Sequence, residues 1–205
     1  MKAITFDGWG ALVDWRAGAA EFVGALLARP HTSDVARPPV DEWLARWQRI
    51  RGKLLTPYRP WRELLVRSFD ATMQHFGLEA FVDDGPGLAR HLAAMEPRPE
   101  AKTALRKLAK KYRLAIVSNP DRETLAEVMG RIQAPISSVV TAEDVKAYKP
   151  DGKIFRLALE RLGLPAGEVM HVAADLVEDI EPARAAGMRA LLLGVDFRSL
   201  DELTV

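Results

Sequence analysis

The sequence predicts an α/β protein whose core is a parallel sheet covered by helices on both faces. Short, fully apolar segments alternate with helical patterns from about residue 100 onward, and the first apolar segment, Ala3–Phe6, has the same character. Strands that are apolar along their whole length are typical of parallel sheets, because helices bury both faces. The other predicted strands are Leu114–Ser118, Ser137–Thr141, Glu168–Ala173 and Ala190–Leu193.

Helical patterns separate these strands. Apolar residues recur at the spacing of a helix face around Leu105, Val128 and Ala158, and a further helix is expected through Ala183. The pattern around Ala158 stops at Gly163, a residue suited to the left-handed conformation that ends many helices. The alternation of helix and strand therefore runs to the last predicted strand.

Residues 16–95 follow a different pattern. Three helical patterns are visible, around Phe22, Trp43 and Phe69, and prolines separate them. No segment there has the alternation or the apolar run of a strand. We therefore predict a helical subdomain, residues 16–95, inserted after the first strand of a core formed by residues 1–15 and 96–205.

Composition excludes several classes of protein. The chain has 205 residues, of which 48% are hydrophobic, and its formal net charge is +1. This balance gives no reason to expect a nucleic-acid or membrane partner. The absence of cysteine excludes disulfides and thiolate nucleophiles. Because a strand pattern begins at Ala3, no signal peptide is expected, and we predict a cytoplasmic protein.

Polar side chains follow three of the predicted strands. In open parallel sheets, ligands bind beyond the carboxyl ends of the strands, near the switch in strand order. The polar residues at or near these ends, together with the lysine of "YKPDG", are Asp7, Ser118, Asn119, Lys149, Asp175 and Asp179. The sequence therefore predicts a site where carboxylates, a hydroxyl, an amide and an ammonium group meet.

Each of these groups has a chemical role open to it. Asp7, exposed on a narrow turn by Gly8 and Gly10, could act as a covalent nucleophile. Lys149 would lower the pKa of a neighbouring carboxylate and neutralise negative charge. Asp175 and Asp179 could hold a divalent cation beside Asp7, or orient Lys149 and a water molecule.

Four segments in the same order resemble the motifs of the haloacid dehalogenase superfamily of hydrolases. They are "FDGWGALVD", "VSN", "YKPDGKIF" and "HVAADLVEDIEPARAAGM", and the similarity spans roughly residues 2–193. The resemblance implies a Rossmann-like core with a helical cap. It also implies that Asp7 is the nucleophile of a covalent aspartyl intermediate, with Ser118, Lys149 and Asp179 as catalytic partners.

The first motif departs from the pattern of the superfamily's phosphatases. Those enzymes carry a second Asp two residues after the nucleophile, where this chain has Trp9, and Ala11 replaces the usual Thr. The dehalogenase branch carries an aromatic residue at the position of Trp9, because a halide leaving group needs no proton. The sequence is therefore most similar to type II 2-haloacid dehalogenases, which implies a small 2-haloacid substrate and no cofactor.

Alternatives to this assignment stay open. Asp175 beside Asp179 resembles a phosphatase-like pair, so a Mg²⁺-dependent phosphatase acting on a small phosphorylated metabolite would bind the metal through Asp7, Asp175 and Asp179. A catalytically impaired relative is a further alternative, supported by Trp9, Ala11 and Ala174.

The dehalogenase resemblance also suggests ligand contacts. Trp9 and Asn119 would bind substrate, and Asn119 would receive the halide together with a cap arginine, either Arg46 or Arg49. A homodimer is implied as well.

Two other interpretations have little support. Gly8 and Gly10 half-match a dinucleotide-binding loop, but Val13 occupies the third glycine position. A Ser118–His171–Asp175 triad has no nucleophile elbow to support it. His171 lies within a predicted strand, and we assign it a structural role.

Overall fold

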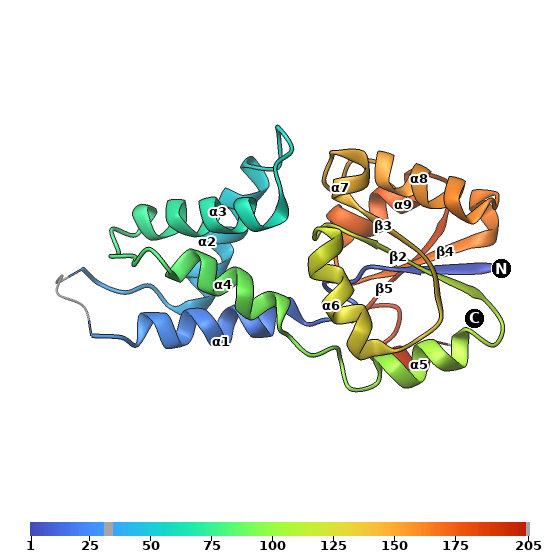
Figure 1. Ribbon diagram of the computed structural model, residues 1–205, viewed down its shortest axis with the longest axis horizontal. Coiled ribbons are helices and arrows are strands. Elements are labelled where there is room, and N and C mark those ends of the chain that lie inside the picture. Colours follow the sequence, from blue (N-terminus) through green and yellow to red (C-terminus); the bar gives the residue numbers. More distant parts are fainter. Residues whose placement is uncertain (31–34, 204–205) are drawn as a thin grey trace. The chain divides into compact units, whose positions relative to one another are not determined.

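The computed structural model describes residues 1–30 and 35–203. The chain forms two compact units, one made of Met1–Asp14 and Glu96–Val205 and the other of Trp15–Met95 (Figure 1). The first unit contains the sheet, and the second is helical. Within the described residues, no helix combines the length and the hydropathy needed to cross a membrane.

The first unit is built on five parallel strands in the order β3-β2-β1-β4-β5, which confirms the predicted fold class. Each predicted strand is found to within a single residue at either end. The strands are β1 (Ala3–Phe6), β2 (Arg113–Ser118), β3 (Ile136–Thr141), β4 (Val169–Ala173) and β5 (Arg189–Leu192).

Strand β1 lies at the centre of the sheet, between β2 and β4. The chain first builds outward through β2 and β3, then returns to the other side of β1 for β4 and β5. Phe6 pairs with Ile116 of β2 and with Val172 of β4, so the carboxyl ends of these three strands meet. This is the switch in strand order at which open α/β sheets place their ligands.

Helices cover both faces of the sheet. Figure 1 shows α8 and α9 on one face and α5 and α6 on the other. A buried cluster joins α8 and α9 to the first of these faces through residues such as Phe155, Ala183, Ala3 and Val117. The helical elements of this unit are α5 (Ala101–Leu108), α6 (Arg122–Ile132), α7 (Ala142–Val145), α8 (Lys153–Leu162), η1 (Ala166–Glu168), η2 (Leu176–Ile180), α9 (Glu181–Ala185) and η3 (Leu200–Glu202).

The second unit has one helix more than the sequence predicted. Its helices are α1 (Trp15–Leu27), α2 (Val40–Lys53), α3 (Trp61–His75) and α4 (Asp84–Ala93). The helix α4 was not predicted because its sequence contains Gly85, Pro86 and Gly87. These residues fall in the first turn of α4, where proline is tolerated. A Cβ on Gly85 would lie 3.3 Å from Val66 Cγ1, so the glycine allows α4 to pack closely on α3.

Candidate active site

Asp7 follows β1 at the centre of the sheet and is almost fully buried, with 3% of its surface exposed. Its backbone N–H donates to the Val172 carbonyl at 2.9 Å, which fixes the residue against β4. Its Oδ1 accepts hydrogen bonds from Lys149 Nζ at 2.8 Å, Ser118 Oγ at 3.1 Å and the Trp9 backbone N–H at 3.3 Å. Among the described residues, the hydrogen bonds to this carboxylate all end on Oδ1. Oδ2 therefore accepts none of these three hydrogen bonds.

The two glycines of the opening turn leave space around the Asp7 carboxylate and its partner Ser118. A Cβ on Gly10 would lie 2.6 Å from Asp7 Oδ2, and the φ of Gly10 is +149°, a value that L side chains rarely adopt. A Cβ on Gly8 would lie 2.9 Å from Leu125 Cδ2 and 3.1 Å from Ser118 Oγ. The Gly10 N–H already donates to the Val13 carbonyl at 2.9 Å, so it is not available to bind a phosphate group. These contacts agree with the rejection of a dinucleotide loop.

Lys149 joins two buried carboxylates. Its ammonium nitrogen lies 2.8 Å from Asp7 Oδ1 and 2.5 Å from Asp179 Oδ1, and all three side chains are at most 4% exposed. Its backbone N–H donates to Asn119 Oδ1 at 2.8 Å, so the end of β2 anchors the lysine loop. The structure thus brings together the four predicted catalytic residues, Asp7, Ser118, Lys149 and Asp179.

The charges of this cluster follow from burial and from the shared lysine. Burial raises the pKa of Asp7, and Lys149 offsets only part of this effect. Burial also acts to raise the pKa of Asp179, but Lys149 and His171 outweigh it, so the pKa of Asp179 falls below its ordinary value. Burial alone would lower the pKa of Lys149, whereas Asp179 and Asp7 together raise it. Lys149 is therefore a cation and Asp179 an anion at neutral pH, and Asp7 is the more easily protonated carboxylate.

His171, which the sequence analysis assigned a structural role, contacts the catalytic cluster. Its Nε2 lies 3.0 Å from Asp179 Oδ1 and its Nδ1 lies 2.9 Å from Thr5 Oγ1. Thr5 precedes Asp7 by two residues, so both side chains leave β1 on the same face. The spacing Thr5-x-Asp7 was visible in the sequence, but the pairing of Thr5 with His171 depends on the register of β1 against β4.

Asn119 occupies the expected position, but its amide is engaged with protein groups. Besides accepting from Lys149, Asn119 donates through Nδ2 to Glu178 Oε2 at 3.3 Å. Glu178 lies in η2, one residue before Asp179, and the sequence analysis did not include it in the site. The rim of the site therefore carries an additional carboxylate beside the amide that was expected to receive an anion.

Asp175 does not join the other carboxylates. Its Oδ1 accepts from the backbone N–H groups of Val177 at 2.9 Å and Glu178 at 2.8 Å, so it caps the N-terminus of η2. The residue before it, Ala174, lies near Gly10: a Cβ on Gly10 would lie 3.5 Å from Ala174 Cβ. The carboxylate of Asp175 is thus directed to the backbone of η2.

The predicted metal set of Asp7, Asp175 and Asp179 is therefore not assembled. The Lys149 ammonium group lies between Asp7 and Asp179, and Asp175 serves as a helix cap. Across residues 1–30 and 35–203, no group of three or more His, Asp or Glu side chains is arranged to hold a metal ion. The structure therefore does not bring together the three carboxylates that the magnesium alternative named.

Trp9 contributes its backbone N–H to the site, and its indole stands where phosphatases of the superfamily carry an acidic side chain. Its N–H donates to Asp7 Oδ1, and the residue is buried, with 7% of its surface exposed. An indole cannot supply the proton that an acidic side chain would supply at this position, because its N–H is a donor without acid–base function near neutral pH.

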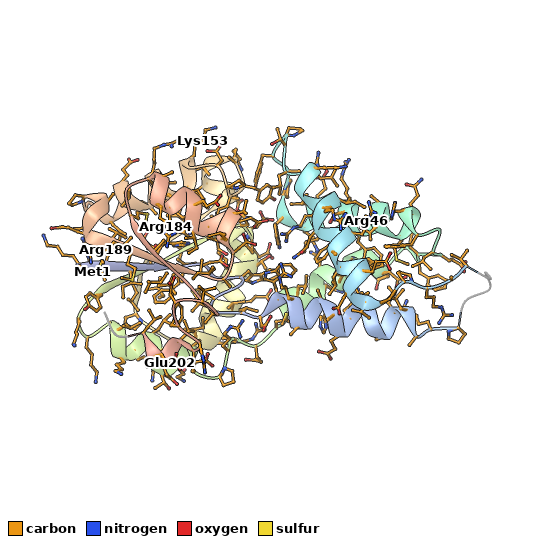
Figure 2. The ribbon with its side chains drawn as sticks, turned by 180° about the vertical axis from the view of Figure 1, so that it is seen from behind. Met1, Arg46, Lys153, Arg184, Arg189 and Glu202 are labelled. Carbon is orange, nitrogen blue, oxygen red and sulfur yellow. The ribbon has the colours of Figure 1, made fainter. Side chains whose placement is uncertain are left out.

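The helical unit carries the two predicted cap arginines on α2. Arg46 (Figure 2) is half-buried and Arg49 is exposed. The same helix buries a third arginine that the sequence analysis did not single out. The Arg51 guanidinium lies 5.1 Å from the ring centre of Trp15, 5.7 Å from that of Trp47 and 5.6 Å from that of Trp61. These distances are within the range of cation–π interactions.

Comparisons with known proteins identify the family of the chain. A family model described as haloacid dehalogenase-like hydrolase matches residues 1–187. "Haloacid dehalogenase-like hydrolase domain-containing protein 3" of Danio rerio is 42% identical over 79 residues, which are 38% of this chain and 33% of that protein. The chain thus spans about a third of the length of that relative.

Two further similarities extend over most of the chain. "(S)-2-haloacid dehalogenase 4A" of Burkholderia cepacia is 28% identical over 185 residues, covering 85% of this chain and 75% of that protein. A crystal structure of an L-2-haloacid dehalogenase superposes with a TM-score of 0.77 at 26% identity, covering 97% of this chain and 91% of that one. These matches confirm the family resemblance that the four motifs indicated. The chain belongs to the haloacid dehalogenase-like hydrolases and is an enzyme.

Proposed function

We propose that this enzyme is a dehalogenase that removes halide from a small 2-haloacid through a covalent aspartyl ester at Asp7. The observation that carries the proposal is the asymmetry of the Asp7 carboxylate. Its Oδ1 is held by donors from Lys149, Ser118 and the Trp9 backbone, whereas Gly10 leaves space at Oδ2. This arrangement suits a carboxylate that attacks carbon along one fixed direction.

In the first step, Asp7 Oδ2 attacks the C2 carbon of the substrate. The new C–O bond forms as the carbon–halogen bond breaks, and the halide leaves with the bonding electron pair. No proton is needed for this leaving group, which accords with Trp9 at the position of the phosphatase acid. Lys149 and Ser118 hold Asp7, and the substrate carboxylate binds beside them. The Asn119 amide and a cap arginine, Arg46 or Arg49, receive the halide.

In the second step, a water molecule positioned by Asp179 attacks the carboxyl carbon of the Asp7 ester. The bond between this carbon and the ester oxygen breaks, which releases a 2-hydroxyacid and regenerates the Asp7 carboxylate. The product keeps the oxygen that Asp7 supplied, and one water oxygen enters Asp7. Lys149 stays beside the carboxylate and stabilises the negative charge that develops on it.

Phosphate-ester hydrolysis has weaker support. Asp175 caps η2 and does not join Asp7 and Asp179, and Trp9 stands at the position of the acid that protonates an alcohol leaving group. General acid–base catalysis accelerates a reaction by about 10²–10⁴-fold, so its loss would slow hydrolysis most for substrates with poor leaving groups. The substrate is proposed to be a small molecule. A homodimer is proposed on the family resemblance alone, and light scattering would measure the oligomeric state.

A paired assay tests the proposal. Halide release from 2-chloropropionate and phosphate release from p-nitrophenyl phosphate are measured for one preparation, each with and without EDTA. We expect halide release that EDTA does not change. EDTA-sensitive phosphate release without halide release would contradict the dehalogenase assignment. In a single turnover in H₂¹⁸O, the label is expected in the Asp7 side chain, and Asp7→Asn is expected to abolish turnover.

A further inference from the structure

We propose that His171, supported by Thr5, is a positioning residue that holds Asp179 in place for hydrolysis of the ester at Asp7. The inference rests on the proposed function and concerns its second step. Asp179 Oδ1 receives two contacts, from Lys149 Nζ and from His171 Nε2 at 3.0 Å. These contacts fix the carboxylate from two directions, and both end on Oδ1.

The two ring contacts hold the imidazole from both sides. His171 Nε2 faces a carboxylate, which can only accept a hydrogen bond, so Nε2 carries a proton. His171 Nδ1 lies 2.9 Å from Thr5 Oγ1, and the Thr5 hydroxyl donates to the Met170 carbonyl at 3.3 Å. Thr5 therefore fixes the ring in the orientation in which Nε2 faces Asp179.

The surroundings of the pair argue for such a role. Thr5 and His171 are register partners on β1 and β4, and both are completely buried. Apolar residues such as Ala3 and Ala115 surround them on this face of the sheet, and Phe155 of α8 packs edge-on against the imidazole, with ring centres 5.1 Å apart. Apolar side chains could fill this space without burying polar groups. What the pair adds is a rigid hydrogen-bonded link to Asp179.

Removal of this link should slow one step more than the other. Without His171, Asp179 is held by Lys149 alone, and its carboxylate can rotate away from the water. A small displacement of a positioned group can reduce the rate by up to about 10²-fold. Attack by Asp7 Oδ2 depends on Lys149 and Ser118 and should change less. The variant should therefore accumulate the ester, with kcat and KM lowered together and kcat/KM nearly unchanged.

Two amide substitutions separate positioning from packing. In His171→Gln, the side-chain amide can reach the location of Nε2 and donate to Asp179. In His171→Asn, the shorter side chain can reach only the location of Nδ1. We expect kcat for 2-chloropropionate to fall roughly tenfold or more in His171→Asn and in Thr5→Val less severely, with His171→Gln close to the wild type. His75→Gln, an exposed histidine on α3, is the matched control.

Intact-mass measurement of acid-quenched steady-state samples supplies the decisive readout. The adduct on Asp7 should be more abundant in His171→Asn than in the wild type or His171→Gln. If the two amide variants behave alike, or if kcat falls without accumulation of the adduct, the positioning role is overturned. Should His171→Asn fail to fold, the comparison of Thr5→Val with the wild type decides in the same way. A wild type without halide release overturns the proposed function itself.

Discussion

Gly10 lies against the Asp7 carboxylate, such that an added Cβ would come within 2.6 Å of Asp7 Oδ2. This relationship explains why the opening turn contains glycine at a position where the backbone φ is +149°. The glycine leaves space beside Oδ2, the oxygen that the proposed function assigns to attack on the substrate.

The first prediction concerns this contact. Gly10→Ala should lower kcat/KM by at least about 10²-fold, because the methyl group blocks Oδ2 and the backbone strain displaces Asp7. Steady-state assays of halide release measure the loss, and circular dichroism checks the fold. Gly130→Ala is the control: a Cβ on Gly130 of α6 meets no atom within 4 Å, so activity should be unchanged. Full activity in Gly10→Ala would contradict the assignment of Oδ2 as the attacking atom.

The second prediction concerns pH. Attack requires ionised Asp7, and burial raises the pKa of Asp7 above its ordinary value of 3.8. Activity should therefore be present at neutral pH and be lost as pH falls through a value above 3.8. The acid limb of kcat/KM for 2-chloropropionate reports this value in the free enzyme. A limb that begins below 3.8, with the enzyme still folded, would contradict a raised pKa of the nucleophile.

The third prediction concerns Glu178. Its carboxylate contacts Asn119 Nδ2 at 3.3 Å and should repel an anionic substrate or compete with it for the amide. Glu178→Gln should lower KM for 2-chloropropionate by roughly threefold at low ionic strength, and added salt should reduce the difference. Glu181→Gln, which removes an exposed carboxylate at the start of α9, is the control. An unchanged KM in Glu178→Gln would show that substrate does not approach this amide.

The fourth prediction distinguishes the arginines of α2. Arg51 lies among the rings of Trp15, Trp47 and Trp61, so Arg51→Ala should lower the free energy of unfolding by about 2 kcal/mol. Arg46→Ala and Arg49→Ala should leave stability nearly unchanged, and the one that binds halide should show a raised KM. Urea denaturation and steady-state kinetics measure the two effects. If neither variant changes KM, the halide site does not use these arginines.

The fifth prediction concerns stability outside the site. Asp144 closes a capping box with Thr141 and pairs with Arg161 and Arg122. Despite the opposing effect of partial burial, these bonds lower its pKa from 3.8 to about 2. A lowered pKa contributes stability that is complete above pH 3.8 and is lost as pH falls through about 2.

Asp144→Asn should therefore destabilise the protein by about 1 kcal/mol at pH 7, after allowance for solvent screening. The difference from the wild type should shrink as the pH falls toward 2, which urea denaturation at several pH values measures. Glu21→Gln, an exposed change on α1, should show no such trend. A difference that stays constant with pH would contradict the linkage.

Much of this enzyme could be predicted from short-range patterns. Apolar runs located the strands, and the helical spacing of apolar residues located most of the helices. Such patterns are visible in the sequence because each kind of element buries side chains at its own regular interval. The carboxyl ends of neighbouring parallel strands meet at one edge, so Asp7, Ser118 and the residues after β4 had to lie close together. The helix α4 was missed because Gly85, Pro86 and Gly87 resemble a loop when the helix start is unknown.

The sequence by itself determined the parallel sheet, the family and the residues that converge on Asp7. Only the tertiary structure decided how the loops after the strands direct their side chains. It made Asp175 a helix cap and placed Ala174 near Gly10, and it joined Thr5 to His171 through strand register. The physical reason is that a strand alternates regularly, whereas the direction of a side chain in an irregular turn depends on which backbone N–H groups need a partner there.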